Sequence, residues 1–168
     1  MSELLKNVDS MRFISASAEE TRAAGRILGS LLQAGNVVFL IGEMGSGKTC
    51  FTQGIGEALR GEEEMVVTSP SYTLLNVYPG RLDLCHFDLF RLDGEMDLED
   101  IGFEECLNEQ VVTVVEWAER IDYRSREGIS VHFSYLGDER RQLVFKAQGE
   151  RSTALLENFC VQFEKEHS

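Results

Sequence analysis

One stretch of eight residues restricts what this chain can fold into more than any other. The stretch is Gly42-Glu43-Met44-Gly45-Ser46-Gly47-Lys48-Thr49, and its pattern GxxxxGK(S/T) is typical of a loop that binds nucleotide phosphates. Small residues let the backbone fold around a phosphate with its N–H groups inward, and the following helix adds the positive end of its dipole. The pattern predicts that Lys48 contacts the β- and γ-phosphates and that Thr49 contacts a bridging Mg²⁺.

The residues on either side supply the structural context that this loop requires. Residues 36–41 are a short, continuous apolar run, which predicts a strand buried on both faces. After the loop, Phe51, Ile55 and Leu59 recur at helical spacing. The sequence therefore predicts a strand, the phosphate loop and a helix in that order.

The rest of the chain alternates apolar strand patterns with helical ones. A capping box at Ser17 opens a helix that Gly35 closes, and further helical patterns cover 48–60, 96–107 and the end of the chain. Residues 111–115 indicate a second buried strand, whereas 74–88 and 129–145 indicate hairpins. We expect one α/β domain over residues 1–168 with the three-layer P-loop NTPase fold and a mostly parallel central sheet with antiparallel hairpin additions. Residues 1–14 would be an N-terminal extension and 152–168 a C-terminal helix.

Charge and hydropathy limit the partners and the location of the protein. The net charge is -13, which is unfavourable for gripping a nucleic-acid backbone, so we expect a partner to hold any RNA. The sequence shows neither an apolar run near the ~20 residues that span a bilayer nor the pattern of a signal peptide. Its four cysteines are scattered without a CxxC pair and predict neither a zinc site nor a disulfide framework. We expect a cytoplasmic protein without membrane contact.

Two carboxylates are candidates for chemistry beside the phosphates. Asp88 ends the apolar run that begins at Leu84, and Glu116 follows the run at 111–115. Ligands of open α/β sheets collect at the carboxyl ends of such strands, where an acidic residue can bind the metal or orient the attacking group. A charged residue after a buried strand is often only the first solvated position. His86 lies on the same strand face as Asp88 and is either a core histidine, which we favour, or a residue that orients a catalytic group.

A hydroxyl-rich loop follows the phosphate-loop helix. Its residues are Ser69, Pro70, Ser71, Tyr72 and Thr73. The loop falls where a switch segment that senses the γ-phosphate is expected, although its composition alone favours an ordinary loop.

Four motifs, in their order and spacing, resemble the TsaE (YjeE) family of small bacterial P-loop ATPases. The motifs cover residues 42–49, 69–74, 86–92 and 116–120. Members of that family are needed to make the N6-threonylcarbamoyl modification of adenosine 37 in tRNA, and their ATP hydrolysis supports multiple turnover by the TsaD–TsaB complex. The resemblance implies a Mg²⁺-dependent ATPase that is weak alone, is stimulated by TsaD-like and TsaB-like proteins, and meets tRNA only indirectly.

The resemblance also implies roles for single residues. Lys48 would grip the phosphates, Thr49 and Glu116 would hold Mg²⁺, and Asp88 would take the acidic role of a Walker B residue. Residues 69–73 would form the switch. The implied nucleotide-binding residues are Gly42, Glu43, Met44, Gly45, Ser46, Gly47, Lys48, Thr49, Cys50, Trp117 and Arg140.

Three residues depart from the family pattern. Cys50 and Ser71 stand where a threonine is usual, and Phe90 stands where a tyrosine is usual. We expect the first two changes to slow hydrolysis or weaken binding without abolishing either.

Two other functions are compatible with a phosphate loop. A small P-loop kinase for a metabolite needs a basic lid over the transferred phosphoryl group, yet residues 92–110 are acidic and contain no Lys or Arg. A nucleotide-gated binding module that hydrolyses little would retain its function in a Glu116→Ala variant that still binds ATP. An ATPase that must cycle would lose it.

Overall fold

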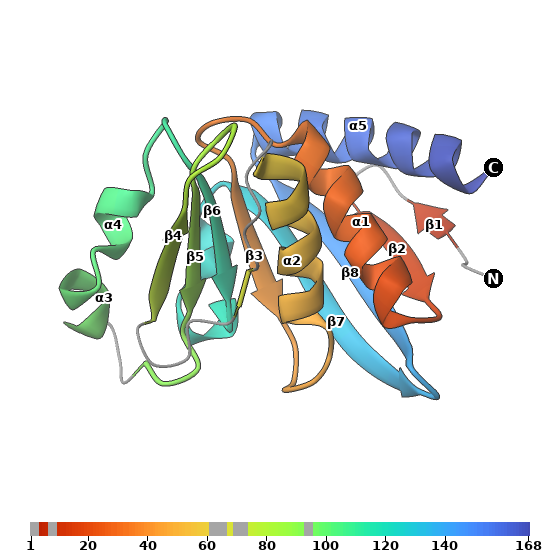
Figure 1. Ribbon diagram of the computed structural model, residues 1–168, viewed down its shortest axis with the longest axis horizontal. Helices are drawn as coiled ribbons and strands as arrows, with labels where there is room; N and C mark the ends of the chain where they lie inside the picture. Colours follow the sequence, from red (N-terminus) through yellow and green to blue (C-terminus); the bar gives the residue numbers. More distant parts are fainter. Residues whose placement is uncertain (1–3, 7–9, 61–66, 69–73, 93–95) are drawn as a thin grey trace.

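A sheet of eight strands forms the centre of the fold (Figure 1). The computed structural model describes residues 4–6, 10–60, 67–68, 74–92 and 96–168. The strands lie in the order β1-β2-β8-β7-β3-β6-β5-β4. Their bounds are β1 (Leu4–Lys6), β2 (Ser10–Ser15), β3 (Val37–Ile41), β4 (Leu75–Tyr78), β5 (Leu84–Asp88), β6 (Val112–Glu116), β7 (Gly128–Gly137) and β8 (Arg140–Gln148).

The middle of this sheet is parallel and its two sides are antiparallel. Strands β7, β3, β6 and β5 pair in parallel, whereas β4 joins one side and β8, β2 and β1 join the other in antiparallel pairs. Both expected hairpins are present, as β4–β5 and β7–β8. The predicted α/β class with antiparallel additions to a parallel centre is confirmed.

Helices cover both faces of the sheet. One face packs against α1 (Ala18–Leu31), α2 (Lys48–Leu59) and α5 (Glu150–His167). The other packs against α3 (Met96–Asp100), α4 (Phe103–Cys106) and the short 3-10 helices η1 (Ala118–Arg120) and η2 (Tyr123–Ser125). Side chains alternate along β3, so that Val38 and Leu40 lie in the first core and Phe39 in the second. The three expected layers are therefore present. Among the described residues, no helix is long and apolar enough to cross a membrane.

Helices α1 and α2 touch backbone to backbone. A Cβ added at Gly25 would overlap the carbonyl oxygen of Phe51, and one added at Gly54 would overlap the carbonyl oxygen of Arg22. Glycine is needed at both places because any side chain would separate the helices. This contact holds α2, and with it the loop at its N-terminus, firmly against α1.

The helix ends follow the sequence with small differences. Ser17 Oγ accepts a hydrogen bond from the Glu20 N–H at 3.1 Å, and Glu20 Oε2 accepts one from the Ala16 N–H at 2.8 Å, so the capping box is present. The predicted helix at 96–107 is divided into α3 and α4, because Gly102 between them has a positive φ of 71°. Helix α5 begins at Glu150, before the predicted Ser152.

The N-terminal residues take part in the sheet, which the sequence did not predict. Strand β2 pairs with β8 from Ser10–Lys146 to Ser15–Arg141. Its Met11 and Phe13 are fully buried, and the Phe13 ring lies 4.7 Å from the ring of Phe163 in α5. The segment that we expected as an extension thus closes one end of the core.

Candidate nucleotide-binding site

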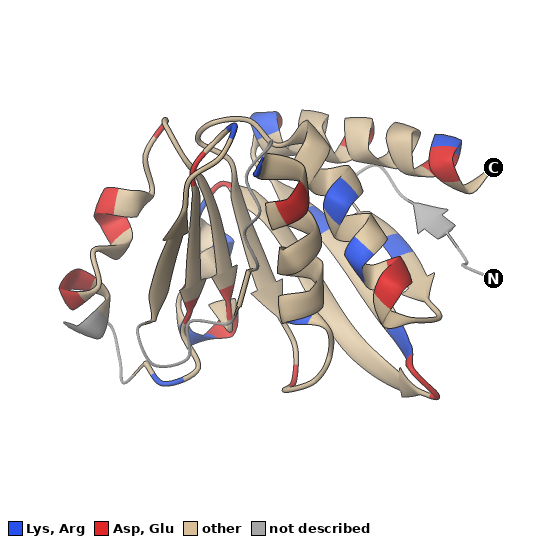
Figure 2. Cartoon of the chain, viewed as in Figure 1, with Lys and Arg blue, Asp and Glu red and all other residues tan. Residues whose placement is uncertain are grey.

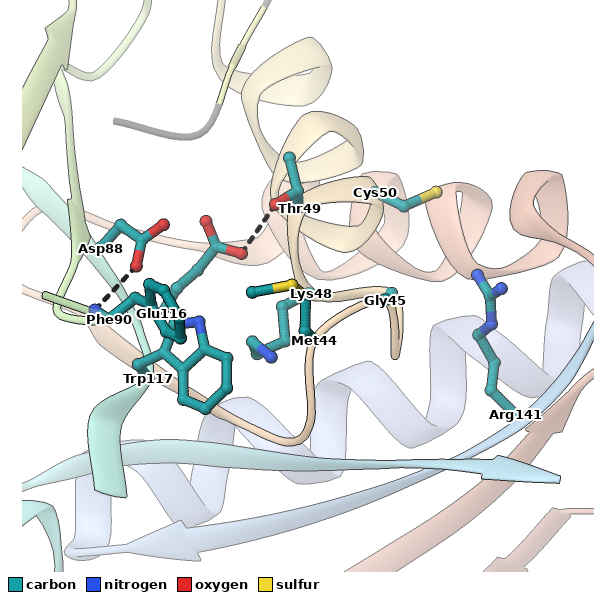
Figure 3. A pocket seen from close by; sticks show the side chains of 11 residues that line it. Met44, Gly45, Lys48, Thr49, Cys50, Asp88, Phe90, Glu116, Trp117 and Arg141 are labelled. Carbon is teal, nitrogen blue, oxygen red and sulfur yellow. Dashed lines mark hydrogen bonds between the residues drawn. The ribbon is translucent and has the colours of Figure 1, made fainter. Parts of the chain in front are cut away.

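A cavity of about 430 Å³ lies at the carboxyl ends of β3, β5 and β6 (Figure 3). It is lined by Met44, Gly45, Gly47, Lys48, Thr49, Cys50, Asp88, Phe90, Glu116, Trp117 and Arg141. Parallel strands bring residues that are distant in sequence to one edge of the sheet, which is where ligands of such sheets bind. The structure therefore brings most of the predicted site residues together. Gly42, Glu43 and Ser46 belong to the same loop but do not line the cavity.

The phosphate loop connects β3 to α2 and carries its lysine inward. Gly45 and Gly47 have φ values of 77° and 110°. A residue with a side chain would be strained in this backbone conformation, so the turn itself requires glycine at both positions. The Lys48 ammonium is buried and donates to the carbonyl oxygens of Gly42 and Glu43, the latter at 2.8 Å. Burial lowers the pKa of Lys48, and the nearby carboxylates of Glu116, Glu119 and Asp88 oppose that change.

Thr49, Asp88 and Glu116 present oxygen atoms beside this lysine. Asp88 and Glu116 are paired in register on β5 and β6, and both are buried. The Thr49 hydroxyl donates to Glu116 Oε1 at 2.9 Å, and Asp88 Oδ1 accepts from the Phe90 N–H at 3.0 Å. Mg²⁺ prefers a few carboxylate or hydroxyl oxygens together with phosphate oxygens and water, and this set fits that preference. In the described part of the chain, no three His, Cys, Asp or Glu residues gather into a complete protein cage for a metal.

His86 contacts the second oxygen of Glu116. Its Nε2 lies 2.6 Å from Glu116 Oε2, and its side chain is fully buried in β5. Its Nδ1 has no hydrogen-bond partner among the described residues. His86 is thus a core histidine, as we favoured, and it also contacts a carboxylate of the candidate site; that this carboxylate is catalytic stays a prediction.

Two aromatic rings form one wall of the cavity. Trp117 directly follows β6 and has a left-handed backbone with φ 57°. Its ring centroid lies 4.2 Å from Lys48 Nζ and 4.9 Å from the ring centroid of Phe90. Trp117 thus lies beside Lys48, and its implied place close to a nucleotide stays a prediction. Phe90 was noted in the sequence only as a departure from the family pattern, and its place in the wall was missed.

The arginine of this cavity is Arg141 and not Arg140, which the resemblance implied. Arg141 lines the cavity, and a Cβ at Gly47 would lie 3.1 Å from its Cδ. Arg140 is exposed and does not line it. Neighbouring residues of a strand point to opposite faces, so a difference of one position in β8 turns the side chain away from the site.

Of the remaining predicted residues, Cys50 lines the cavity and the switch residues 69–73 are not among those that the structure describes. Cys50 lines the cavity, but its thiol donates to the carbonyl oxygen of Ala18 at 3.1 Å and points away from Lys48 (Figure 3). Burial raises the pKa of the Cys50 thiol. The predicted switch, residues 69–73, lies outside the described residues. Just after it, the Leu74 carbonyl accepts from the Asp88 N–H at 3.0 Å.

Known proteins share both the sequence and the fold. Residues 15–143 match the family described as "Threonylcarbamoyl adenosine biosynthesis protein TsaE". Two proteins named "tRNA threonylcarbamoyladenosine biosynthesis protein TsaE" are similar: that of Treponema pallidum is 42% identical over 79% of this chain and 98% of its own length. That of Bacillus subtilis is 34% identical over 88% of this chain and 92% of its own length. The crystal structure of Bacillus subtilis YdiB matches with a TM-score of 0.75 and 29% identity over 95% of this chain and 96% of that one. This chain, with its phosphate loop and paired strand-end carboxylates, belongs to the TsaE family.

Proposed function

We propose that this protein binds ATP with Mg²⁺ and hydrolyses it as the ATPase component of tRNA N6-threonylcarbamoyladenosine (t6A37) biosynthesis. It acts with TsaD-like and TsaB-like proteins, is weak alone and is stimulated by them. The main support for ATPase activity is the row of contacts from Thr49 through Glu116 to His86, next to Lys48. The names of the relatives support the pathway.

The residues of the cavity divide the work of phosphoryl transfer to water. Lys48 binds the β- and γ-phosphates in place of its two loop carbonyls. Thr49 and Glu116 hold Mg²⁺, with Asp88 in the Walker B-like acidic role close by. When bound, the metal neutralises the charge that develops on the transferred phosphoryl group. Trp117 and Phe90 cover one side of the cavity, which limits the access of water other than the attacking molecule.

Charge determines how the protein takes part in the pathway. With a net charge of -13 it is repelled by nucleic acid as a whole, so its partners hold the tRNA and its own role with tRNA is indirect. We place the protein in the cytoplasm, where tRNA is modified.

Tryptophan fluorescence tests the nucleotide site directly, because Trp117 is the single tryptophan and its ring lies over Lys48 Nζ. A titration with ATP·Mg²⁺ should give a saturable change, and Lys48→Ala should abolish it. A parallel titration with GTP·Mg²⁺ measures the preference for the base. If calorimetry detects ATP binding while Trp117 stays unchanged, the assignment of Glu116 and Trp117 to the nucleotide is wrong.

Hydrolysis separates the three candidate functions. ATP loss without an added acceptor supports the ATPase and opposes the kinase. The Glu116→Ala variant should bind ATP, dock on TsaD-like and TsaB-like proteins and fail to support repeated turnover. Full pathway function of this variant would instead establish the nucleotide-gated binding module.

A further inference from the structure

A second cavity, of about 400 Å³, lies between strands β2, β7 and β8 and the 3-10 helix η2. It shares no lining residue with the cavity at the phosphate loop. Lys146 of β8 is paired in register with Ser10 of β2 on one side and Ser130 of β7 on the other. Directly opposed residues point to the same face of a sheet, so these three side chains form a row along the cavity.

The charge of this region differs from that of the whole protein. The chain has 29 Asp and Glu against 16 Lys and Arg, yet β2, β7 and β8 contain no acidic residue. Figure 2 shows blue bands without red along β2 and β8 up to the β7–β8 turn. The described residues that line the cavity include Arg124, His132 and Lys146 and no carboxylate. A local excess of positive charge is therefore built into an acidic protein.

Arg124 and Lys146 lie close enough to His132 for their charges to disfavour its protonated form. The pKa of His132 is lowered by burial and then by the charges of Lys146 and Arg124. His132 Nε2 lies 3.4 Å from the Tyr123 hydroxyl, and the Arg124 guanidinium lies 5.1 Å from the Tyr123 ring centroid. Gln148 Nε2 donates to the Arg124 backbone carbonyl, which ties η2 to β8. Side chains from β7, β8 and η2 thus converge on the cavity, where an anion would be attracted to the cations of Lys146 and Arg124.

We propose that this cavity is a second anion site and that it binds a phosphate group. A phosphate carries nearly two negative charges and three strong acceptor oxygens. The cavity offers the matching donors, with the cations of Lys146 and Arg124 and the hydroxyls of Ser10 and Ser130. A monocarboxylate would meet only part of this set. The phosphate belongs either to a small phosphorylated molecule, which is a monoester, or to an RNA backbone, whose diester groups each carry one charge and two free oxygens. Both offer anionic phosphoryl oxygens to the same donors.

The phosphate loop must be silenced before this site can be measured. The test uses the full chain with Lys48→Ala, inorganic phosphate as the probe, and the His132 imidazole signal in NMR as the reporter. His132→Gln assigns that signal among the three histidines of the chain. Phosphate should shift the signal saturably and raise the pKa of His132, because a bound anion stabilises the imidazolium.

Matched variants locate the binding. Adding Lys146→Gln should weaken phosphate binding by about fivefold or more, since a charged hydrogen bond is removed. Lys165→Gln removes the same charge from an exposed position on α5 and should have no effect. Absence of a saturable shift, or an equal shift after Lys146→Gln, would overturn the proposal.

A parallel titration with unmodified tRNA identifies the source of the phosphate. The site is assigned to an RNA backbone if tRNA shifts the His132 signal at a lower concentration than phosphate does. This shift should also fall steeply as salt is added and should be lost with Lys146→Gln. A shift with inorganic phosphate but not with tRNA assigns it to a small phosphorylated molecule. A tRNA effect that survives Lys146→Gln, together with no response to phosphate, contradicts a phosphate site in this cavity.

Discussion

His86 Nε2 and Glu116 Oε2 lie 2.6 Å apart across the parallel strands β5 and β6, with both side chains buried. The other oxygen of Glu116 accepts from Thr49 at 2.9 Å. Glu116 is therefore held from both sides, and the histidine fixes how the carboxylate faces the cavity in which we propose that Mg²⁺ binds. Mutation of a residue that orients a metal ligand in this way typically lowers metal affinity or activity by about 10 to 100-fold.

Removing this histidine should alter the requirement for metal. We expect His86→Ala to raise the Mg²⁺ concentration that supports half-maximal ATPase activity by about 10 to 100-fold. Binding of ATP without metal should change much less, because Lys48 remains in place. The measurement is the steady-state rate against MgCl₂, with His167→Ala, at the exposed end of α5, as the control. An unchanged Mg²⁺ dependence, with only a lower melting temperature, would reduce His86 to a packing residue.

Arg140 and Arg141 form a matched pair for testing which arginine serves the nucleotide. Arg141 lines the cavity and Arg140 is exposed outside it. Loss of a charge-assisted contact to phosphate costs about 1.5–3 kcal/mol, so Arg141→Gln should weaken ATP binding by roughly 10-fold or more. Arg140→Gln should bind ATP as the unaltered protein does. Calorimetric titration with ATP gives the affinity of both variants. If Arg140→Gln weakens ATP binding and Arg141→Gln does not, Arg140 is the nucleotide-binding arginine, as the family pattern implied.

An ion-pair cluster between α1 and α2 should make stability depend on pH. Glu57 accepts from Arg22 and from Arg26, the latter at 3.0 Å. Burial alone would raise the pKa of Glu57, but these hydrogen bonds and charges outweigh it and the pKa is lowered. A lowered folded-state pKa gives stability that is present above the unfolded value, near 4.3, and is lost as pH falls through the folded value.

The Glu57→Gln variant measures this contribution. At pH 7 it should lower the free energy of unfolding by about 1 kcal/mol, a modest figure because both arginines are partly exposed. The difference should shrink towards zero as the pH falls below about 4. Urea unfolding at several pH values gives the comparison, and Glu157→Gln on the exposed side of α5 serves as the control. A difference that is constant with pH would show that the ion pairs do not stabilise the fold.

The close contact of α1 with α2 predicts that replacing a helical glycine by alanine destabilises the protein, which is the opposite of the usual effect. Alanine normally stabilises a helix relative to glycine by about 1 kcal/mol. Gly54→Ala should instead destabilise by about 2 kcal/mol, because its Cβ would overlap the Arg22 carbonyl oxygen. Ala154→Gly, at an exposed position of α5, should show the ordinary cost of glycine. Thermal unfolding compares the two, and a stabilised Gly54→Ala variant would mean that the helices are farther apart.

Structural features that depend on residues close together in the sequence could be predicted. Features that depend on the pairing of strands far apart in the sequence could not. The phosphate loop and the strand before it follow from a local pattern, and the two strand-end carboxylates from where apolar runs stop. Strand β2 was missed because its burial depends on pairing with β8, from which it is separated by most of the chain. The choice between Arg140 and Arg141 depends on the register of β8, which composition does not reveal. The role of His86 was left open because only the pairing of β5 with β6 places it against Glu116.

The Lys48 ammonium group has two partners within its own loop, because the carbonyl oxygens of Gly42 and Glu43 accept hydrogen bonds from it. A ligand thus gains only the difference between its own oxygens and these carbonyls. A sugar hydroxyl or an amide exchanges one neutral acceptor for another and gains almost nothing. A phosphate oxygen brings a full negative charge and displaces them. If the loop binds nucleotide phosphates as we propose, these two carbonyl contacts would make it selective for ligands of high charge density, and neutral metabolites would not compete for the lysine.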